Sequence, residues 1–233
     1  MRLKIDAARR HGRQTVAPPA DRRTPGLDET GAAPLLAPVI YLVRHGQTEF
    51  NRDRRIQGHV DSALTALGVS QAQASAALLA DLIRAPEDGW RIVSRPLGRA
   101  HDTARIVAGR LGLPVELDDR LKEMSWGTYD GMLRSDFDAR HPEMTNAKRW
   151  AFEVSDGEQY ADVAARVGDW LGGLPPEPER RIIAVSHGIT GQVLRALYAN
   201  LDPDHAGQDG APQDAIFLLE NGAIGRIDCE PVD

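Results

Sequence analysis

The sequence predicts an α/β fold with a doubly wound, mostly parallel sheet, helices on both faces of the sheet and a C-terminal hairpin. Short apolar runs rich in β-branched residues recur along the chain, as expected of strands that are buried on both faces. Segments with apolar residues at helical spacing alternate with these runs, and this alternation is typical of parallel sheets. Near the end, two apolar runs flank Asn221-Gly222, which is a strong signal for a two-residue hairpin turn.

The first strand and the first long helix follow Pro38, where the predicted domain begins. Residues 39–43, VIYLV, form a continuous apolar run that predicts a buried strand. Residues 64–83 are expected to form a helix with Thr65 as its N-cap. The apolar residues at helical spacing in this helix are Ala72, Ala76, Leu79 and Ile83.

Two further strand–helix pairs complete the parallel part of the predicted sheet. Residues 91–94, RIVS, predict a strand, and the next helix is expected to begin near Pro96 and to end before Gly112. Residues 181–186, RIIAVS, predict another buried strand. A helix at 188–201 follows with almost no loop, so its N-terminus lies directly at the end of that strand.

Residues 1–37 are predicted to be a poorly ordered N-terminal extension, and residues 38–233 a single domain. The extension is rich in Pro, Gly, Ala and charge and has no sustained periodicity. It holds seven Lys/Arg and four Asp/Glu, a net charge of +3, so the remainder carries −6 − 3 = −9. An acidic body of this kind can bind an anion only through a local cluster of arginines.

Composition and charge exclude several classes of function. The chain of 233 residues contains no apolar run of the roughly 20 residues that span a bilayer. Its start lacks the apolar centre of a secretory signal, and its net charge of −6 disfavours nucleic-acid binding. Cys229 is the single cysteine, so an intramolecular disulfide is excluded and we expect a cytoplasmic protein.

Three predicted strands end in residues that suit anion binding. These ends read Arg44-His45-Gly46, Ser94-Arg95 and Ser186-His187-Gly188, and Arg99 lies one turn into the helix after the second. Ligands of open α/β sheets bind beyond the carboxyl ends of the strands, so we expect these residues to converge. Guanidinium groups pair with phosphate oxygens, and a helix N-terminus adds N–H donors. The sequence therefore predicts a site for a phosphoryl group.

A phosphoryl site with two histidines can do more than bind. A neutral imidazole has a lone pair that can attack phosphorus, and the second imidazole can stabilise the transferring group. The leaving alkoxide needs a proton donor, and Glu123 is the candidate because it lies in a glycine-punctuated loop beside Met124 and Trp126. The same carboxyl group could later activate water as a base.

Four segments of the chain resemble a known family. They are LVRHGQTEFN, SRPLGRAHDTA, LKEMSWGTYDG and AVSHGIT, and they occur in that order. In content and order they resemble the histidine phosphatase superfamily, in the branch of phosphoglycerate mutases and their phosphatase relatives. The resemblance covers Val39 to about Asp228 and implies a phosphoglycerate mutase-like fold.

The resemblance implies a role for each matching residue. His45 matches the nucleophile that forms a phosphohistidine, and Glu123 matches the proton donor and acceptor. Arg44, Arg99 and His187 match the groups that hold the phosphoryl oxygens. The expected substrate-binding residues are Thr48, Asn51, Gln57, Gly58, Gly188 and Ile189, with Gln57 and Gly58 in a loop that closes over the substrate. The resemblance also implies that the reaction uses no metal and no other cofactor.

The sequence favours hydrolysis of a small phosphomonoester over mutase activity. Mutases that resemble this chain usually carry asparagine at the position of Ile189, and their proline-rich insertion is missing here. The chain also departs from the phosphatase relatives, at Gln159 and at Ala63. A phosphoglycerate mutase-like phosphoryl transfer and a non-catalytic phospholigand-binding protein stay open as alternatives.

The sequence predicts the phosphate-binding residues but not the shape of the pocket for the leaving group. The expected partner is a small phosphomonoester, without nucleic acid or membrane, and a homodimer is an analogy with the family alone. Arg95 and Arg134 are candidates to bind a second charged group of the substrate, although a solvated side chain is the default for each. His59 lies near the expected closing loop and is a weaker candidate for substrate contact.

Overall fold

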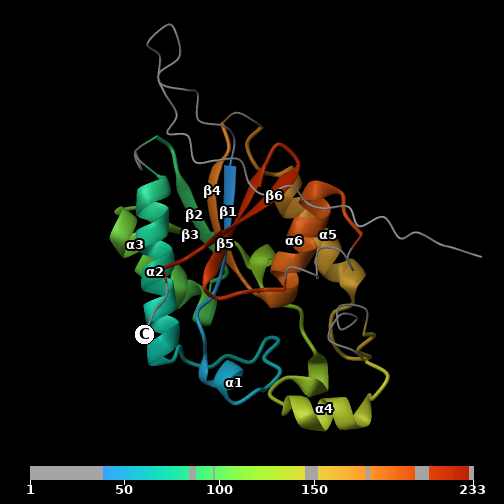
Figure 1. Ribbon diagram of the computed structural model, residues 1–233. Helices are drawn as coiled ribbons and strands as arrows, with labels where there is room; N and C mark the ends of the chain where they lie inside the picture. Colours follow the sequence, from blue (N-terminus) through green and yellow to red (C-terminus); the bar gives the residue numbers. More distant parts are fainter. Residues whose placement is uncertain are drawn as a thin grey trace, which may run out of the picture. The chain divides into compact units, whose positions relative to one another are not determined.

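The structure is a computed structural model that describes residues 39–83, 88–96, 98–144, 152–176, 179–202 and 210–230. Its strands are β1 Val39–Arg44, β2 Arg91–Ser94, β3 Val115–Leu117, β4 Arg181–Ser186, β5 Ala215–Glu220 and β6 Ala223–Asp228. They form one sheet in the order β3-β2-β4-β1-β5-β6 (Figure 1). The predicted extension at residues 1–37 lies outside the described residues, so the domain boundary stays a prediction.

The sheet is parallel over four strands and antiparallel over the last two. Strand β4 pairs in parallel with β1 and β2, and β2 pairs in parallel with β3. Strands β5 and β6 form the predicted hairpin, which joins the sheet antiparallel to β1. Asn221 and Gly222 at its turn have φ values of +51° and +72°, as a type I′ turn requires. The predicted fold class is confirmed.

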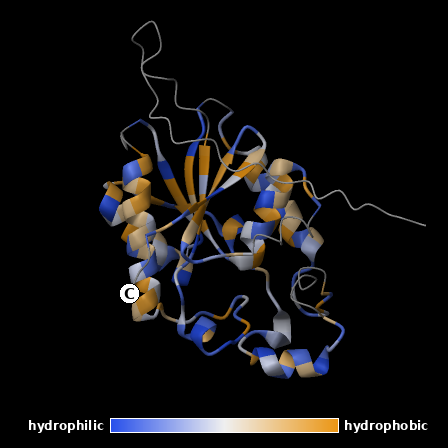
Figure 2. Cartoon of the chain, viewed as in Figure 1, coloured by the Kyte–Doolittle hydropathy of each residue, from blue (hydrophilic) through white to orange (hydrophobic). Residues whose placement is uncertain are grey.

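Helices cover both faces of the sheet. They are α1 Glu49–Arg52, α2 Ala66–Leu82, α3 Arg99–Leu111, α4 Arg134–Arg140, α5 Tyr160–Gly172 and α6 Gly188–Ala199, with short 3-10 helices η1 Asp119–Leu121 and η2 Gly127–Tyr129. Along β1, Tyr41 and Val43 pack with α2 and α3, whereas Ile40 and Leu42 pack with α5 and α6. A strand buried on both faces must be apolar at every position, and Figure 2 shows this in the central strands.

The start of α2 and the end of α3 are as predicted from the sequence, whereas the start of α3 differs. The Thr65 side chain caps α2 by accepting from the Gly68 N–H, and Gly112 ends α3 with a left-handed backbone at φ +70°. The expectation that α3 begins near Pro96, with Arg99 one turn into it, is wrong. Gly98 is the N-cap with a non-helical backbone, φ +75°, so Arg99 is the first helical residue.

Helices α1 and α4 lie beyond the carboxyl ends of the parallel strands (Figure 1). An isolated β-bridge between Arg55 and Leu133 joins the segment after α1 to the start of α4, and another between Thr48 and Leu64 joins the start of α1 to the segment before α2. A separate apolar cluster around Trp126 and Phe137 supports this part of the domain. This part of the domain lies beyond the edge of the sheet at which the sequence predicts the site. Every helix in the described part of the chain is too short or too polar to cross a bilayer.

Candidate active site

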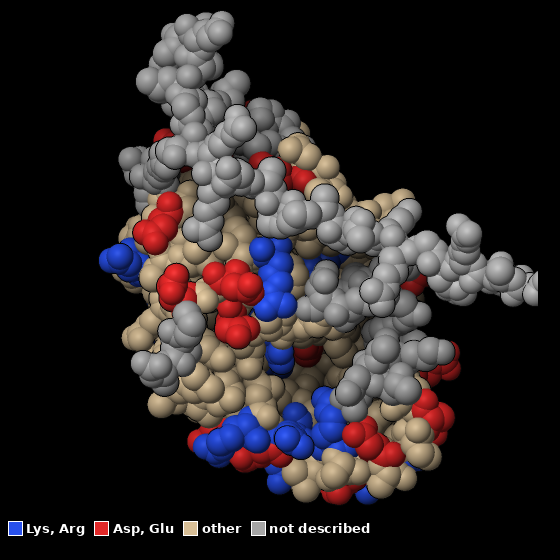
Figure 3. Space-filling view, viewed as in Figure 1, with Lys and Arg blue, Asp and Glu red and all other residues tan. Residues whose placement is uncertain are grey.

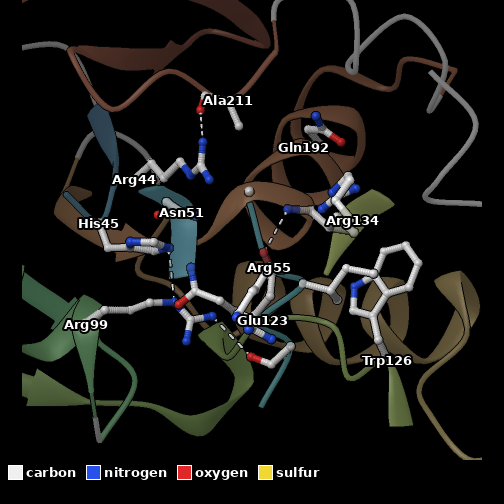
Figure 4. Close-up of a pocket in the computed structure, with 15 residues that line it drawn as sticks. Arg44, His45, Asn51, Arg55, Arg99, Glu123, Trp126, Arg134, Gln192 and Ala211 are labelled. Atoms are coloured by element: carbon white, nitrogen blue, oxygen red, sulfur yellow. Dashed lines mark hydrogen bonds between the residues drawn. The ribbon is translucent and has the colours of Figure 1, made fainter. Parts of the chain in front are cut away.

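The carboxyl ends of β1, β2 and β4 meet at one edge of the sheet. Arg44 at the end of β1 lies opposite Ser186 at the end of β4, and the His45 N–H donates to the Ser186 carbonyl at 3.0 Å. A cavity of about 300 Å³ opens at this edge, with His45, Arg99 and Glu123 among the residues that line it (Figure 4). Segments far apart in the sequence therefore converge as predicted.

His45 is held as a neutral imidazole with a lone pair on Nε2. Its side chain is buried, its Nδ1 lies 2.8 Å from the Gly46 carbonyl, and the Arg99 Nε–H donates to Nε2 at 3.1 Å. A carbonyl cannot donate and a guanidinium cannot accept, so these partners assign the proton to Nδ1. Burial, followed by the positive charges of Arg99 and Arg44, holds the pKa of His45 well below 6.5.

Two arginines flank His45. Arg99 is 1% exposed and donates to the carbonyls of Val60 and Gly58, both at 3.1 Å, while its Nη1 lies 3.3 Å from Asp61 Oδ1. Arg44 donates to the Ala211 carbonyl, but its buried Nε has no hydrogen-bond partner among the described residues. Burial lowers the pKa of both guanidinium groups. Placing them together costs free energy, which an anion between them would offset.

His187 lies beside His45, and neither of its ring nitrogens has a hydrogen-bond partner in the described part of the chain. The side chain is 1% exposed, and the two imidazole rings are 5.2 Å apart between centroids. Burial, followed by the charge of Arg99, holds the pKa of His187 well below 6.5. Buried polar atoms in folded proteins are rarely left without a partner, so the two nitrogens indicate a ligand site.

Glu123 is fixed at the N-terminus of α6. Its carboxylate accepts from the backbone N–H groups of Ile189 at 3.2 Å and Thr190 at 3.0 Å, and from the Met124 N–H at 3.0 Å. The dipole of a helix N-terminus favours a carboxylate there. Ile189 and Gly188 do line the cavity, but the Ile189 N–H is occupied by Glu123 instead of being free for a ligand.

The predicted substrate loop is tied to the first motif. Gln57 donates from Nε2 to Thr48 Oγ1 at 2.8 Å, and Thr48 is also the N-cap of α1. Asn51 Oδ1 accepts from the Thr48 N–H and from Gln213 Nε2, so the Nδ2 group of Asn51 is the one left to donate to a ligand. Asn51, Gln57 and Gly58 line the cavity, whereas Thr48 holds the loop from behind.

The chain is similar to known proteins along most of its length. The model of the histidine phosphatase superfamily, branch 1, matches residues 40–220 of the chain. The chain belongs to this superfamily. A "Glucosyl-3-phosphoglycerate phosphatase" of Mycobacterium tuberculosis is 38% identical over 175 residues, covering 70% of this chain and 75% of that protein. "Probable phosphoglycerate mutase GpmB" of Enterobacter sp. is 37% identical over 195 residues, covering 81% of this chain and 84% of that protein.

A solved structure is also similar to this histidine phosphatase. It is a mycobacterial glucosyl-3-phosphoglycerate phosphatase in complex with VO3, with a TM-score of 0.68 and 31% identity. The match covers 82% of this chain and 97% of that chain. The relatives include proteins named as phosphatases and as mutases, and hydrolysis of a phosphomonoester is the activity that fits this membership of the superfamily.

Several residues at the site of this histidine phosphatase were missed by the sequence analysis. Gln213 donates from Nε2 to the His45 carbonyl and to Asn51 Oδ1, both at 3.0 Å, but it lies in a loop outside every motif. Arg55, which the sequence analysis did not single out, lines the cavity. Arg134 lines it too, and for this residue the sequence had offered a substrate-binding role beside the default of a solvated side chain. Figure 3 shows Lys and Arg side chains on both sides of a hollow in this face.

His59 and Arg95, two further candidates for substrate contact from the sequence, do not line the cavity. His59 Nε2 lies 2.9 Å from the Glu123 backbone carbonyl and 3.5 Å from Glu158 Oε2, so it packs against the loop of Glu123. Arg166 also pairs with Glu158, and the contacts with His59 and Arg166 outweigh the burial of Glu158 and hold its pKa at about 2.

Arg95 is absent from the lining of the cavity. Among the described residues, no group of three or more His, Cys, Asp and Glu could hold a metal ion.

Proposed function

We propose that this histidine phosphatase hydrolyses a small phosphomonoester in two steps, through a phosphohistidine on His45. The observation that carries the proposal is the contact between the Nε2 lone pair of His45 and the Arg99 guanidinium. The atom that would attack phosphorus and a group that would hold the phosphoryl oxygens therefore lie side by side. The Nε of Arg44 and the ring nitrogens of His187 have no partner within the described residues, and in this proposal they complete the surroundings of the phosphoryl group.

In the first step, His45 Nε2 forms a bond to phosphorus while the bond from phosphorus to the ester oxygen breaks. Glu123 donates a proton to that oxygen, so an alcohol leaves instead of an alkoxide. In the second step, Glu123 accepts a proton from water, whose oxygen bonds to phosphorus as the phosphorus–nitrogen bond breaks. Inorganic phosphate leaves, and His45 and Glu123 return to their initial protonation states.

The remaining residues act on the charge of the transferring group. In this proposal Arg44, Arg99, His187 and the Nδ2 group of Asn51 donate to the phosphoryl oxygens, whose negative charge they would stabilise in the transition state. Arg44, Arg99 and Asn51 line the cavity, and the His187 ring lies 5.2 Å from the His45 ring between centroids. In this proposal the positive charge comes from arginines, and the reaction proceeds without a metal. Hydrolysis is therefore expected to persist in EDTA.

The first experiment measures phosphate release from p-nitrophenyl phosphate with EDTA present. Wild type is expected to turn over, and His45→Ala to lose activity by at least about 1,000-fold because the nucleophile is gone. His101→Ala is the matched control, since His101 lies on α3 outside the cavity. Equal activity of His45→Ala and wild type, or loss of all activity in EDTA, would contradict the mechanism.

Mutase activity is the second candidate, because several relatives carry the name "Probable phosphoglycerate mutase GpmB". The same assay separates the two when 3-phosphoglycerate is supplied with a bisphosphoglycerate primer. Isomerisation faster than phosphate release would favour the mutase. Phosphate binding with neither activity would favour a non-catalytic binding protein.

Compartment and assembly are part of the proposal. A cytoplasmic enzyme fits the single cysteine, Cys229, which is free in the structure. A homodimer is proposed by analogy with the family alone. Cell fractionation and light scattering of the purified protein test these two statements.

A further inference from the structure

A buried arginine outside the phosphoryl cavity has no role in the proposed mechanism. Arg195 lies on α6, its side chain is 1% exposed, and it does not line the cavity that holds His45. It lines instead a second, smaller cavity together with Arg44 and His187. Burying a guanidinium group costs free energy that an apolar side chain of similar size would avoid. An arginine at this position therefore calls for a reason beyond packing.

Arg195 contacts the segment that leads into β5 at two points. Its guanidinium carbon lies 3.8 Å from the centre of the Phe217 ring, and its Nη2 donates to the Gly210 carbonyl at 2.5 Å. A longer contact joins its Nε to the Gly191 carbonyl within α6, at 3.4 Å. A planar guanidinium group can stack on a ring and donate within its own plane at the same time, which an ammonium group cannot do. One side chain thus holds residues on both sides of the intervening loop.

The loop between these two contacts touches three residues of the site. Arg44 donates to the Ala211 carbonyl (Figure 4). Gln213 donates from Nε2 to the His45 carbonyl and to Asn51 Oδ1, both at 3.0 Å. The first contact fixes the orientation of the Arg44 guanidinium group. The second keeps Asn51 Oδ1 occupied, so that Nδ2 is left to donate to a ligand.

We propose that Arg195 is a positioning residue, which holds residues 210–213 where they orient the groups that meet the phosphoryl group. These groups are Arg44, His45 and Asn51. The inference rests on the proposed function and adds to it a residue that acts without touching the substrate. Donors that are oriented before binding need no reorganisation when charge develops on the phosphoryl oxygens. Loss of the Arg195 contacts is therefore expected to weaken phosphate binding and catalysis together.

The test measures hydrolysis of p-nitrophenyl phosphate and its inhibition by inorganic phosphate. Arg195→Met keeps the approximate length of the side chain but loses its donors. The inhibition constant of phosphate is expected to rise roughly 10- to 100-fold, and kcat/KM to fall by a similar factor with a higher KM. Arg195→Lys keeps the charge without the planar fork, so intermediate values are expected. Arg105→Met is the matched control, since Arg105 is an exposed arginine of α3 outside both cavities.

Gln213→Ala separates an effect on the site from a general loss of stability. It removes the contacts to His45 and Asn51 at a half-buried loop position, so phosphate affinity should fall while the thermal unfolding temperature stays close to that of wild type. Arg195 is proposed to act through the same loop, so the double variant with Arg195→Met should bind phosphate about as weakly as the more severely affected single variant. Gln73→Ala, at an exposed position of α2, is the control for this substitution.

Three results would overturn the positioning role. The first is an Arg195→Met variant that unfolds at a lower temperature but keeps the wild-type KM and inhibition constant, because a residue needed for stability alone changes the folded fraction and not its affinity. The second is a Gln213→Ala variant with unchanged phosphate affinity. The third is a double variant whose loss of affinity is the product of the two single losses. Should Arg195→Met not fold, Arg195→Lys takes its place in each comparison.

Failure of the proposed function has a different signature. A wild type that does not hydrolyse p-nitrophenyl phosphate would contradict the proposed function. Calorimetric titration with inorganic phosphate then reads the affinities of the same variants without any turnover. The two failures are therefore distinguishable.

Discussion

The state of His45 depends on contacts made by atoms of its backbone as well as by its ring. The Gly46 N–H donates to Thr103 Oγ1 at 3.1 Å, and Thr103 in turn donates to the Arg99 carbonyl at 2.9 Å. Gln213 holds the His45 carbonyl from the other side. The residue after the candidate nucleophile and the arginine beside that nucleophile are therefore joined through one buried hydroxyl group, Thr103 Oγ1.

Glu123 provides a prediction at this scale, because its role depends on how good the leaving group is. Glu123→Gln removes the proton that an alkoxide needs, so kcat/KM for glycerol 3-phosphate should fall by about 100-fold or more. p-Nitrophenolate leaves without a proton, so kcat/KM for its ester should fall much less. Steady-state kinetics with both esters measure the difference, and Glu143→Gln, at an exposed position, is the control. An equal loss on both esters would argue against an acid.

At the scale of elements, the site depends on a close approach of two backbone segments. A Cβ atom on Gly46 would lie 2.1 Å from the Gly68 carbonyl oxygen, and one on Gly68 would lie 2.0 Å from the Gln47 carbonyl oxygen. The loop after β1 thus packs directly against the first turn of α2. The Thr65 N–H donates to the Gln47 carbonyl at 2.9 Å and fixes this contact. Glycine is required at both positions because any side chain would push the helix from the loop.

Substitution of these glycines gives a prediction with an internal control. Gly46→Ala and Gly68→Ala should each lower the free energy of unfolding by about 1–3 kcal/mol or more, because two backbones must separate. Gly109 in α3 has no atom within 4 Å of its added Cβ, so Gly109→Ala should raise stability by up to about 1 kcal/mol. Urea unfolding measures all three. A Gly46→Ala variant as stable as wild type would contradict the close approach.

At the scale of the whole molecule, the fold gathers positive charge at one edge of an acidic protein. The chain has a net charge of −6, yet four arginines of its described part line a single cavity. Two buried histidines lie at the same edge and stay neutral because burial and the arginines disfavour a further positive charge. Stability should therefore depend on pH through His45 and His187.

The unfolded chain protonates both histidines near pH 6.5, whereas the folded protein keeps them neutral to a lower pH. As the pH falls below about 6.5, the unfolded state therefore binds more protons than the folded state. The free energy of unfolding is highest above this pH and decreases as the pH falls toward the pKa of the histidines in the folded protein. Two such groups give a slope of up to about 2.7 kcal/mol per pH unit. Urea unfolding between about pH 7.5 and about pH 5.5, without phosphate, measures it.

His187→Asn should remove about half of this slope, because asparagine does not take up a proton in this range. The comparison is made in the same buffers as for wild type. A slope that is unchanged in His187→Asn would mean that other groups carry the pH dependence.

The sequence by itself determined the elements whose signals are local. Continuous apolar runs set β1, β2 and β4, and Thr65, Gly112 and Asn221-Gly222 set a helix start, a helix end and a hairpin. The location of the motif residues at the strand ends follows from the predicted strands, because parallel strands bring their carboxyl ends to the same edge of the sheet. Helix α5 was overlooked although Val163, Val167 and Trp170 have helical spacing.

Tertiary structure alone decided which other residues complete the site. Gln213 and Arg55 lie in loops, and their positions follow from long-range contacts that no local pattern encodes. For Arg134 the sequence left a substrate-binding role and a solvated side chain open, and the structure has it in the lining of the cavity. Glu123 was recognised from its motif, but its anchoring on the N-terminus of α6 depends on packing between distant segments. The physical reason is that the apolar pattern of a strand and the residues that end it are local in the sequence. The position of a loop side chain depends instead on contacts with residues that are distant in the sequence.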